Sequence, residues 1–409
     1  MIVQTVIATD LITPLGAYLR VREAGGASFL LESVEKGRLG RYSLLGAGSR
    51  LVSFDEAAES AEPVVGYLGY DHAATLEPTV PLPDAGRGLP ESLFVIADVL
   101  VRFDHGRGMA EVLCGDPEHV TDLLAGPLPT LPTGDGSPGP LRRSPSRHDY
   151  ERSVSRAREH IAAGDAFQIV LSQRAERPTS AGALELYRSL RRVNPSPYMF
   201  LLELGELALV GSSPETLVKA EGRRASANPI AGTTSPGDGD AARLLSSEKD
   251  RAEHVMLVDL ARNDLSRVCV PGSVHVERFL EAERFSHVTH LVSEVAGTLR
   301  PEVSHFDLLR AAFPAGTVSG APKVRAMQII SELEGHRRGT FAGAVGYFLP
   351  GEAFDTCIAI RTILLKDGVA YLQAGAGIVA DSDPQSEQQE CLNKLAAVET
   401  AIRLAEARS

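Results

Sequence analysis

The sequence contains no tryptophan, and its four cysteines are far apart, without a CxxC pair. Isolated cysteines argue against a disulfide framework and against a cysteine-based zinc site. Positive charge is also scarce, because 41 lysines and arginines face 53 aspartates and glutamates, which gives a net charge of -12. This balance argues against nucleic acid and anionic membrane surfaces as partners.

Long apolar runs are missing as well. No stretch reaches the length of a membrane-spanning helix. The N-terminus, MIVQTVIATDLITPLG, has no basic start followed by a long apolar segment, so it is unlike a secretory signal. We therefore expect a cytoplasmic protein without membrane contact.

A chain of 409 residues can bury a large core, and its composition divides it into three parts. Residues 1–115 hold apolar runs without helical periodicity, such as 29–45 and 94–105, and are expected to be β-rich. Residues 116–146 are crowded with proline and glycine and are expected to form a surface linker. Residues 147–409 are expected to complete one interleaved globular unit.

Helices and strands alternate after the linker. Helical patterns at 148–163 and 184–193 flank an apolar strand at 166–174, and a strand pair follows in MFLLELGELALVGSS. Hairpins mixed with helices predict an α+β fold, in which two sheets have helices packed outside them.

The C-terminal helix pattern carries two acids and a base on one face. Asp383 can cap this helix, and Pro384 suits its first position, where a missing N–H costs nothing. Glu387, Glu390 and Lys394 then follow three and four residues apart, so all three project from the same face.

A second helical pattern, EKDRAEHVMLVDLARND, repeats half of this arrangement with Asp250 and Glu253. Each acidic stripe alone is most simply a solvated face with intrahelical ion pairs. Two helices that each offer a pair of carboxylates, however, supply the oxygen ligands that Mg²⁺ needs.

Several longer motifs point to a known family. They are EKDRAEHVMLVDLARND, FPAGTVSGAPKVRAMQIISELE, FAGAVGY, CIAIRT and QAGAGIVADSDPQSE. Together they resemble the chorismate-utilising enzymes, and among these the large synthase subunits of anthranilate synthase. The resemblance runs in order from about residue 29 to the C-terminus. It implies a β-sandwich of two large mixed sheets flanked by helices.

The resemblance also implies a Mg²⁺ site between the two acidic helices. Glu253 and Glu390 match the carboxylates that hold the ion, and Asp250 and Glu387 match the pair that supports it. The ion would grip the ring carboxylate of chorismate, a dianion that an acidic pocket could not otherwise accept. Lys394 matches a lysine near that carboxylate.

Gly375, Ala376 and Gly377 are expected to form a turn whose backbone N–H groups face the same carboxylate, since glycine permits a close approach. The alternative is a GxGxxA dinucleotide-binding turn between a strand and a helix. That alternative is disfavoured because the sequence ends without a further strand to complete a βαβ unit.

Four further residues match binding and catalytic roles of the family. Arg361 lies in CIAIRTILL, whose alternation predicts a strand, and its planar guanidinium would bind the enolpyruvyl carboxylate. His290 and Thr317 match active-site residues, although a lone histidine on an apolar strand face is more often a core residue. Glu215 matches the general acid that protonates the departing C4 hydroxyl, a role that requires burial and a raised pKa.

Two positions separate the reactions within the family. Sister enzymes that add water at C2 have a lysine where this chain has Gln168, and those that make the 4-amino product have one where it has Ala231. The following Gly232 and Thr233 of PIAGT are also expected to bind substrate. Without either lysine, isochorismate, salicylate and 4-amino-4-deoxychorismate synthesis are disfavoured. Ammonia addition at C2, followed by pyruvate loss to give anthranilate, is favoured.

Phe341 leaves open whether the enzyme eliminates pyruvate. Relatives commonly have a tyrosine there whose hydroxyl helps Arg361 hold the enolpyruvyl carboxylate, and a hydrogen bond to a charged group contributes roughly 1.5–3 kcal/mol. The segment 234–236 and Asn228 also depart from the family pattern. One alternative is therefore an enzyme of secondary metabolism that stops at 2-amino-2-deoxyisochorismate, and another is a non-catalytic tryptophan-binding or scaffold subunit.

The resemblance implies two partners besides chorismate and ammonia. No cysteine lies in a GxCxG nucleophile context, so ammonia is expected from a separate glutamine amidotransferase subunit. The segments LLES and NPSPYMF resemble a feedback pocket for tryptophan, with retention for packing as the alternative. The residues expected in that pocket are Leu31, Glu32, Ser33, Asn194, Pro197, Tyr198 and Met199.

Overall fold

The computed structural model describes residues 6–33, 41–131, 137–234, 237, 239–284 and 289–407. Predictions that concern 34–40, 235 and 236 lie outside the described residues, as does the side chain of Thr233. Among the described residues, no helix combines the length and the apolar character needed to cross a membrane.

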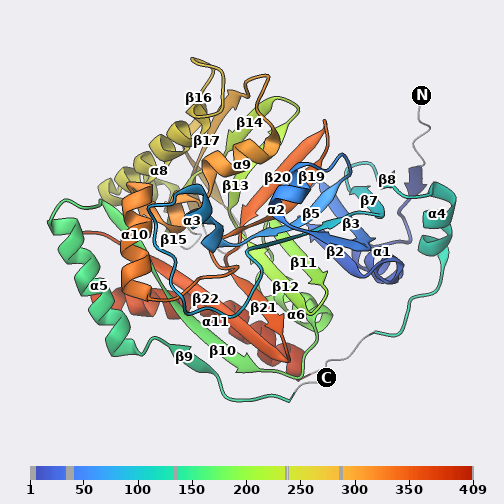
Figure 1. Ribbon diagram of the computed structural model, residues 1–409, viewed down its shortest axis with the longest axis horizontal. Coiled ribbons are helices and arrows are strands. Elements are labelled where there is room, and N and C mark those ends of the chain that lie inside the picture. The colour runs from blue at the N-terminus through green and yellow to red at the C-terminus, as the bar shows by residue number, and fades with distance from the viewer. Residues whose placement is uncertain are drawn as a thin grey trace.

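Two large β-sheets occupy the centre of the molecule (Figure 1). The first sheet has twelve strands among the described residues. Their spatial order is β1 (Val6–Ala8), β8 (Met109–Cys114), β7 (Val99–Asp104), β3 (Tyr42–Gly48), β2 (Ala27–Glu32), β11 (Tyr198–Leu204), β12 (Leu207–Ser213), β21 (Thr362–Lys366), β22 (Val369–Ile378), β10 (Gln168–Pro178) and β18 (Gly320–Ala321), with β9 (Arg142–Ser144) also on β10.

The second sheet has ten strands in the same part of the chain. Their order is β15 (Ile230–Thr234), β17 (Thr289–Thr298), β14 (Arg224–Ala227), β13 (Thr216–Glu221), β20 (Ala353–Ile358), β19 (Ala344–Leu349), β5 (Val64–Leu68), β6 (Ser92–Ile96) and β4 (Arg50–Val52), with β16 (His275–Arg284) also on β17.

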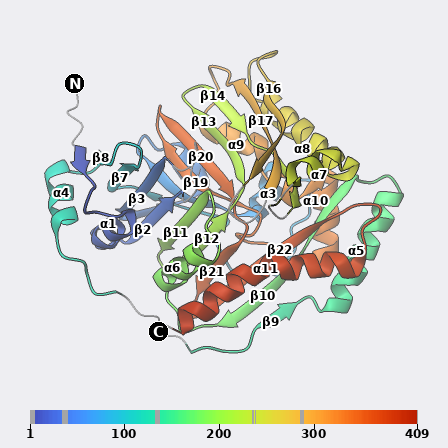
Figure 2. The same ribbon diagram turned by 180° about the vertical axis from the view of Figure 1, so that it is seen from behind.

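Helices cover the outer faces of both sheets (Figures 1 and 2). In Figure 2 the longest of them, α11, crosses the face of the first sheet beside α6. The helices are α1 (Pro14–Val21), α2 (Phe54–Ala58), α3 (Ala73–Leu76), α4 (Pro117–Ala125), α5 (Arg147–Ala162), α6 (Ala183–Val193), α7 (Asp240–Ser246), α8 (Glu248–Ser266), α9 (His305–Ala312), α10 (Lys323–Glu334) and α11 (Pro384–Glu406).

Buried apolar clusters lie between the two sheets and between each sheet and its helices. Phe29 and Phe200 of the first sheet pack with Val65 and Tyr67 of the second, so the two sheets share one buried core. Further clusters lie between each sheet and its helices. The predicted α+β sandwich with helices outside is confirmed.

Both halves of the chain build both sheets. In the first sheet β2 pairs with β11, and in the second β5 pairs with β19. The predicted surface linker, 116–146, is more structured than expected, because it starts with α4 and ends with β9. Asp116 caps α4 by accepting from the backbone N–H groups of Glu118 and His119, a local signal that the density of proline and glycine obscures.

The apolar run at 94–105, which is expected to be β-rich, forms two strands in different sheets. β6 ends at Ile96 in the second sheet, and β7 begins at Val99 in the first. The chain therefore changes sheets at Ala97 and Asp98. Asp98 is exposed between the two buried strands, but a single acid does not show that the strands belong to different sheets.

One buried charge, Arg338, joins three parts of the fold. It is 2% exposed, and its guanidinium bonds Glu334 of α10 at 2.7 and 2.9 Å. It also donates to the carbonyl oxygens of Val170 in β10 and Val318, each at 2.7 Å. Glu334 in turn accepts from the backbone and hydroxyl of Ser172 in β10. Every polar group of this pair has a partner, as a buried ion pair requires.

We expect Arg338→Met to lower the free energy of unfolding by about 3–5 kcal/mol, since it leaves Glu334 as a buried charge without its partner. Urea denaturation followed by circular dichroism measures the change. The control is Arg147→Ala, which breaks an exposed pair with Glu151 and should cost less than about 1 kcal/mol. Superimposable curves for Arg338→Met and the unmodified protein would contradict this account.

Candidate active site

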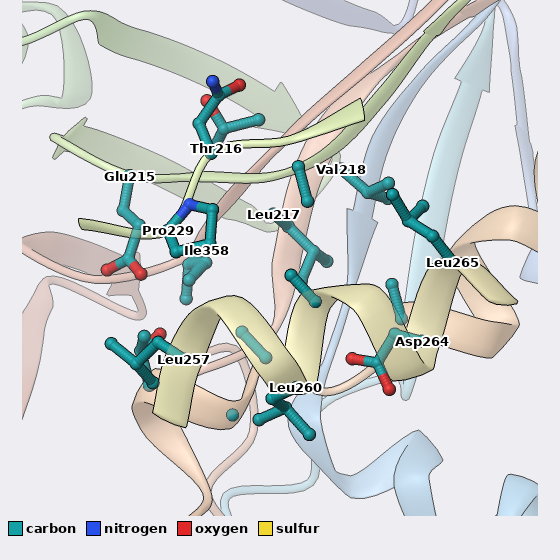
Figure 3. Close-up of a pocket in the computed structure, with 17 residues that line it drawn as sticks. Glu215, Thr216, Leu217, Val218, Pro229, Leu257, Leu260, Asp264, Leu265 and Ile358 are labelled. Carbon is teal, nitrogen blue, oxygen red and sulfur yellow. The ribbon is translucent and has the colours of Figure 1, made fainter. Parts of the chain in front are cut away.

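Glu215 lies in the link between β12 and β13, where the chain passes from the first sheet to the second. Its side chain points from this link toward Leu257 of α8 (Figure 3). The carboxyl is half-buried, and the loss of water around it raises its pKa to about 7, against the lowering effects of the Thr317 hydroxyl and of the Lys394 and Arg361 charges. Glu215 is thus protonated in an appreciable fraction of molecules near neutral pH.

Arg361 lies in the reverse crossing, between β20 of the second sheet and β21 of the first. The predicted continuous strand is wrong here, because Arg361 has a φ of 50° and is in neither strand. A non-glycine residue in this left-handed region is strained, and such strain is often found at functional sites. The change of sheet requires the bend, and a local alternation pattern does not reveal it.

The Arg361 guanidinium is placed so that it can bind an anion. Burial lowers its pKa, and the charge of Glu215 opposes that shift. In the described part of the chain, no carboxylate lies within 4 Å of it. A half-buried guanidinium without an ion pair favours an incoming carboxylate, which it can bind through two parallel hydrogen bonds.

His290 of β17 has a defined tautomer. Its Nδ1 lies 2.9 Å from the carbonyl oxygen of Gly232, and a carbonyl only accepts, so Nδ1 carries the proton and Nε2 the lone pair. Burial lowers the pKa of His290 below its usual value, so the ring is neutral near pH 7. The histidine is half-buried rather than in the core.

Gly232 brings the first acidic helix to this histidine. It has a φ of 67°, and a Cβ there would lie 3.2 Å from the Cβ of Asp250 at the start of α8. Only glycine allows this close approach together with this backbone conformation. His290 and Asp250 therefore lie on either side of one backbone position.

The turn predicted at residues 375–377 is wrong, because these residues continue β22 in register with β10. Glycine is needed here for space. A Cβ on Gly377 would lie 2.5 Å from Nε2 of Gln168. The dinucleotide-binding alternative fails for the same reason, since its glycines form a tight turn rather than a strand.

Gln168, the first residue of β10, thus lies against Gly377. Its side chain is buried, and its Oε1 has no hydrogen-bond partner among the described residues. On β22, the strand that contains Gly377, the carbonyl oxygen of Gly375 accepts a hydrogen bond from Lys394 of α11 at 2.8 Å. These contacts join the C-terminal helix to the site.

The four acids proposed for Mg²⁺ are distributed over α8 and α11. Asp250, Glu253 and Glu387 are half-buried, whereas Glu390 is exposed and forms an ion pair with Lys394 at 2.7 Å. Within the described ranges no three acidic, histidine or cysteine side chains converge enough to hold a metal ion. Mg²⁺ usually takes only one or two protein carboxylates and keeps water and substrate as further ligands, so this donor set fits it.

A small cavity of about 50 Å³ beside Glu215 contains polar groups that were not predicted as site residues. Asn228 and Asp264 line it together with Thr317, and the Oδ1 of Asn228 has no hydrogen-bond partner among the described residues. Asp264 is buried and bonds Lys323 at 2.9 Å. Asp264 is the last residue of LARND in α8. Its position in the sequence does not distinguish it from the exposed acids of the same helix.

Phe341 is buried, and its ring packs 5.5 Å from the guanidinium of Arg338. The ring is part of the apolar cluster between the second sheet and its helices. Its neighbour Ala342 has a φ of 64° and donates to the carbonyl oxygen of Ala359, two residues before Arg361.

A second and much larger cavity, of about 910 Å³, lies between the sheets. It brings together all but one of the residues predicted for the tryptophan pocket. The exception, Asn194, instead donates to the hydroxyl of Ser212 at 3.0 Å. The ligand of this cavity stays a prediction. The predicted residues that line it are Leu31, Glu32, Ser33, Pro197, Tyr198 and Met199.

Comparisons with known proteins show the family to which the chain belongs. The family described as chorismate binding enzyme matches residues 29–400. Anthranilate synthase component 1 of Thermus thermophilus is 42% identical over 97% of this chain and 97% of that protein. The corresponding protein of Streptomyces coelicolor is 45% identical over 97% and 88%. The crystal structure of anthranilate synthase component I from Streptococcus pneumoniae has a TM-score of 0.81 and 35% identity, covering 96% of this chain and 99% of that one.

The fold and the site define a chorismate-utilising enzyme, and the chain belongs to the chorismate binding enzyme family. Within that family its relatives identify it as an enzyme of the anthranilate synthase type, similar to the component 1 subunits.

The raised pKa of Glu215 has a cost in stability that can be measured. The unfolded chain ionises this carboxyl near pH 4.5, whereas the folded protein does so near 7, so folding stability falls as the pH rises between these values. The loss is at most about 3 kcal/mol, from 1.36 kcal/mol per pKa unit. Glu215→Gln removes this loss, so the melting temperature of the variant relative to the unmodified protein should rise from pH 4.5 to 8.

Differential scanning calorimetry across this range tests the prediction. Glu159→Gln on the exposed face of α5 is the matched control and should give a difference that does not change with pH. A difference between Glu215→Gln and the unmodified protein that is also independent of pH would mean that Glu215 ionises normally in the folded state.

Proposed function

We propose that the protein adds ammonia to C2 of chorismate and then eliminates pyruvate to give anthranilate. The observation that carries this proposal is the pairing of Glu215, a carboxyl with a pKa near 7, with Arg361, a guanidinium that has no ion pair among the described residues. One supplies a proton and the other binds a carboxylate, and both face the same site.

Arg361 and Lys394 bind the two carboxylates of the substrate. Arg361 takes the enolpyruvyl carboxylate in a bidentate contact. Lys394 turns from Glu390 toward the ring carboxylate, which the exposure of this ion pair permits. Two positive groups on different elements fix the orientation of the ring between them.

Mg²⁺, when bound, neutralises and orients the ring carboxylate. Glu253 and Glu390 would hold the ion, and Asp250 and Glu387 would support them. Release of Lys394 from Glu390 would make that carboxylate available.

Glu215 donates its proton to the C4 hydroxyl, which leaves as water while ammonia adds at C2. A general acid is most effective when its pKa lies near the working pH, and the half-buried position of Glu215 supplies that match. The product of this step is 2-amino-2-deoxyisochorismate.

His290 assists the second step. Its neutral ring has the lone pair on Nε2, and from there it removes the proton at C2 while the C3–O bond to the enolpyruvyl group breaks. The departing enolpyruvate takes up a proton to become pyruvate, and the ring becomes aromatic.

Ammonia rather than water is the nucleophile we assign, because Gln168 and Ala231 offer no amine at the two positions where sister enzymes have lysine. Ammonia needs no strong base to activate it. We assign its supply to a separate glutamine amidotransferase subunit, in line with the name component 1 of the relatives.

The test is to incubate the lone chain with chorismate, Mg²⁺ and an ammonium salt at alkaline pH and to separate the products by mass. Anthranilate fluorescence is a second readout, and its background is low because the chain has no tryptophan. We expect anthranilate and pyruvate in equal amounts. A nonaromatic amino product that keeps its enolpyruvyl group would instead assign the truncated reaction and give Phe341 a decisive role.

Arg361→Met should raise the KM for chorismate at least about tenfold, since a lost hydrogen bond to a charged group is worth about 1.5–3 kcal/mol. Arg361→Lys should recover part of the loss. Arg192→Met, on the exposed end of α6, is the matched control and should leave KM unchanged. Equal KM values for Arg361→Met and Arg192→Met would remove Arg361 from the substrate site.

A further inference from the structure

His254 of α8 is completely buried, and no step of the proposed mechanism uses it. Its helix lies beside β16 and β17 of the second sheet (Figure 2). The Nε2 of His254 is 2.6 Å from the hydroxyl oxygen of Ser293 in β17. The same oxygen accepts from the backbone N–H of Leu280 in β16 at 3.0 Å. One oxygen therefore joins a helix and two strands, and we call His254, Ser293 and Leu280 the helix anchor.

The direction of these bonds follows from the number of protons. A backbone N–H only donates, so the Ser293 oxygen accepts from Leu280. The single proton of this hydroxyl is then available for Nε2 of His254. In that neutral tautomer the ring proton lies on Nδ1, which is buried and has no hydrogen-bond partner among the described residues. The ring is therefore held at Nε2, and the anchor depends on that bond.

Ser293 is a fixed point of the second sheet. Its backbone N–H donates to the carbonyl oxygen of Pro229, just before β15, at 3.1 Å. The pairing of β16 with β17 is irregular over residues 278–281, where Leu280 has a φ of 53°. The Ser293 hydroxyl accepts from the N–H of Leu280 in this irregular stretch. His254 is thus bonded to a residue that the neighbouring backbone already holds in place.

Apolar side chains also hold α8 on the second sheet. Val258 and Leu265 of α8 belong to the same buried cluster as Leu217 of β13 and Val295 of β17. Apolar packing is not directional, so it holds the helix on the sheet without setting its rotation. A buried polar contact sets the orientation, as a single polar residue fixes the register of a coiled coil.

The rotation of α8 decides where two of the acids proposed for Mg²⁺ point. Asp250 lies one turn before His254 on the same helix face, and Glu253 is its direct neighbour. A side-chain tip lies about 5–6 Å from the helix axis, so a rotation of about 20° moves it about 2 Å. Mg²⁺ requires near-ideal octahedral geometry, with oxygen ligands at about 2.0–2.1 Å. A small rotation of the helix would therefore remove the Glu253 carboxylate from the ion.

We propose that His254 is a positioning residue for the metal ion, because the helix anchor sets the rotation of α8 and so directs Glu253. The inference rests on the Mg²⁺ site of the proposed function. His254 is completely buried, so it acts through the helix rather than on the ion. The acids of α11 do not depend on the anchor, and its loss weakens the site without abolishing it. Excess metal then restores the correct rotation by mass action.

Mn²⁺ is a suitable probe, because it takes the same oxygen ligands as Mg²⁺ and the paramagnetic resonance of the free ion gives a Kd without turnover. With the full chain and Mn²⁺ alone, His254→Leu and Ser293→Ala should each raise the Kd at least about fivefold. His254→Gln should keep most of the affinity, since the glutamine amide can accept from Ser293 in place of Nε2. In ammonia-dependent synthesis, the Mg²⁺ concentration for half-maximal rate should rise with the Kd, while kcat at saturating Mg²⁺ changes less than about threefold.

Thr356→Val is the matched control. Thr356 of β20 is also buried in the second sheet, and its hydroxyl donates to the carbonyl oxygen of Val218 at 2.7 Å. The variant loses a buried hydrogen bond, as Ser293→Ala does, but none to α8. We expect it to lower the melting temperature to a similar extent and to leave the Kd for Mn²⁺ unchanged.

Two outcomes would overturn the inference. One is a Kd for Mn²⁺ in His254→Leu and Ser293→Ala that equals that of the unmodified protein, and the other is an equal rise in Thr356→Val. If His254→Leu does not fold, Ser293→Ala decides, because it removes only a hydroxyl. Failure of the proposed metal site gives a different result, since the unmodified chain would then bind no Mn²⁺ at millimolar concentration, and the inference would fail with it.

Discussion

The buried pair of Arg338 and Glu334 is the interaction on which the site most depends. It links α10 to β10 and fixes the carbonyl oxygens of Val170 and Val318. Val170 is two residues from Gln168, and Val318 follows Thr317, so the pair holds two walls of the site at a set distance. Because a buried ion pair is stable only when every hydrogen-bonding group is satisfied, this contact allows little adjustment.

The catalytic side chains around the Arg338–Glu334 pair lie in a less favourable environment. Glu215, His290 and Arg361 are all half-buried, and the protein shifts the pKa of each toward its neutral form. Arg361 also carries backbone strain. The charges of a bound substrate offset these unfavourable pKa shifts and this strain. The site is therefore complementary to a dianion before the dianion binds.

Much of the architecture could be predicted from local patterns. The start of α11 at Pro384 and the hairpin of β11 and β12 follow directly from capping and alternation. Two of the errors share one physical cause, which is the passage of the chain between sheets. Neither the break at Ala97 nor the bend at Arg361 has a local signal, because each is set by strands distant in sequence. Arg338 was missed for a similar reason, since GHRRGT reads as an exposed basic turn and only the packed fold buries it.

The pairing of β5 with β19 also affects how the chain folds while it is being synthesised. Gly66 is in register with Gly346, so some 280 residues must be made before this strand finds its neighbour. Until then its edge stays open, and open strand edges are sites of aggregation. Such long-range pairings are slow to form. The N-terminal part of the chain therefore cannot complete its sheets on the ribosome before the C-terminal part is made. A chain cut between β8 and α5 would leave each sheet without the strands of the other part.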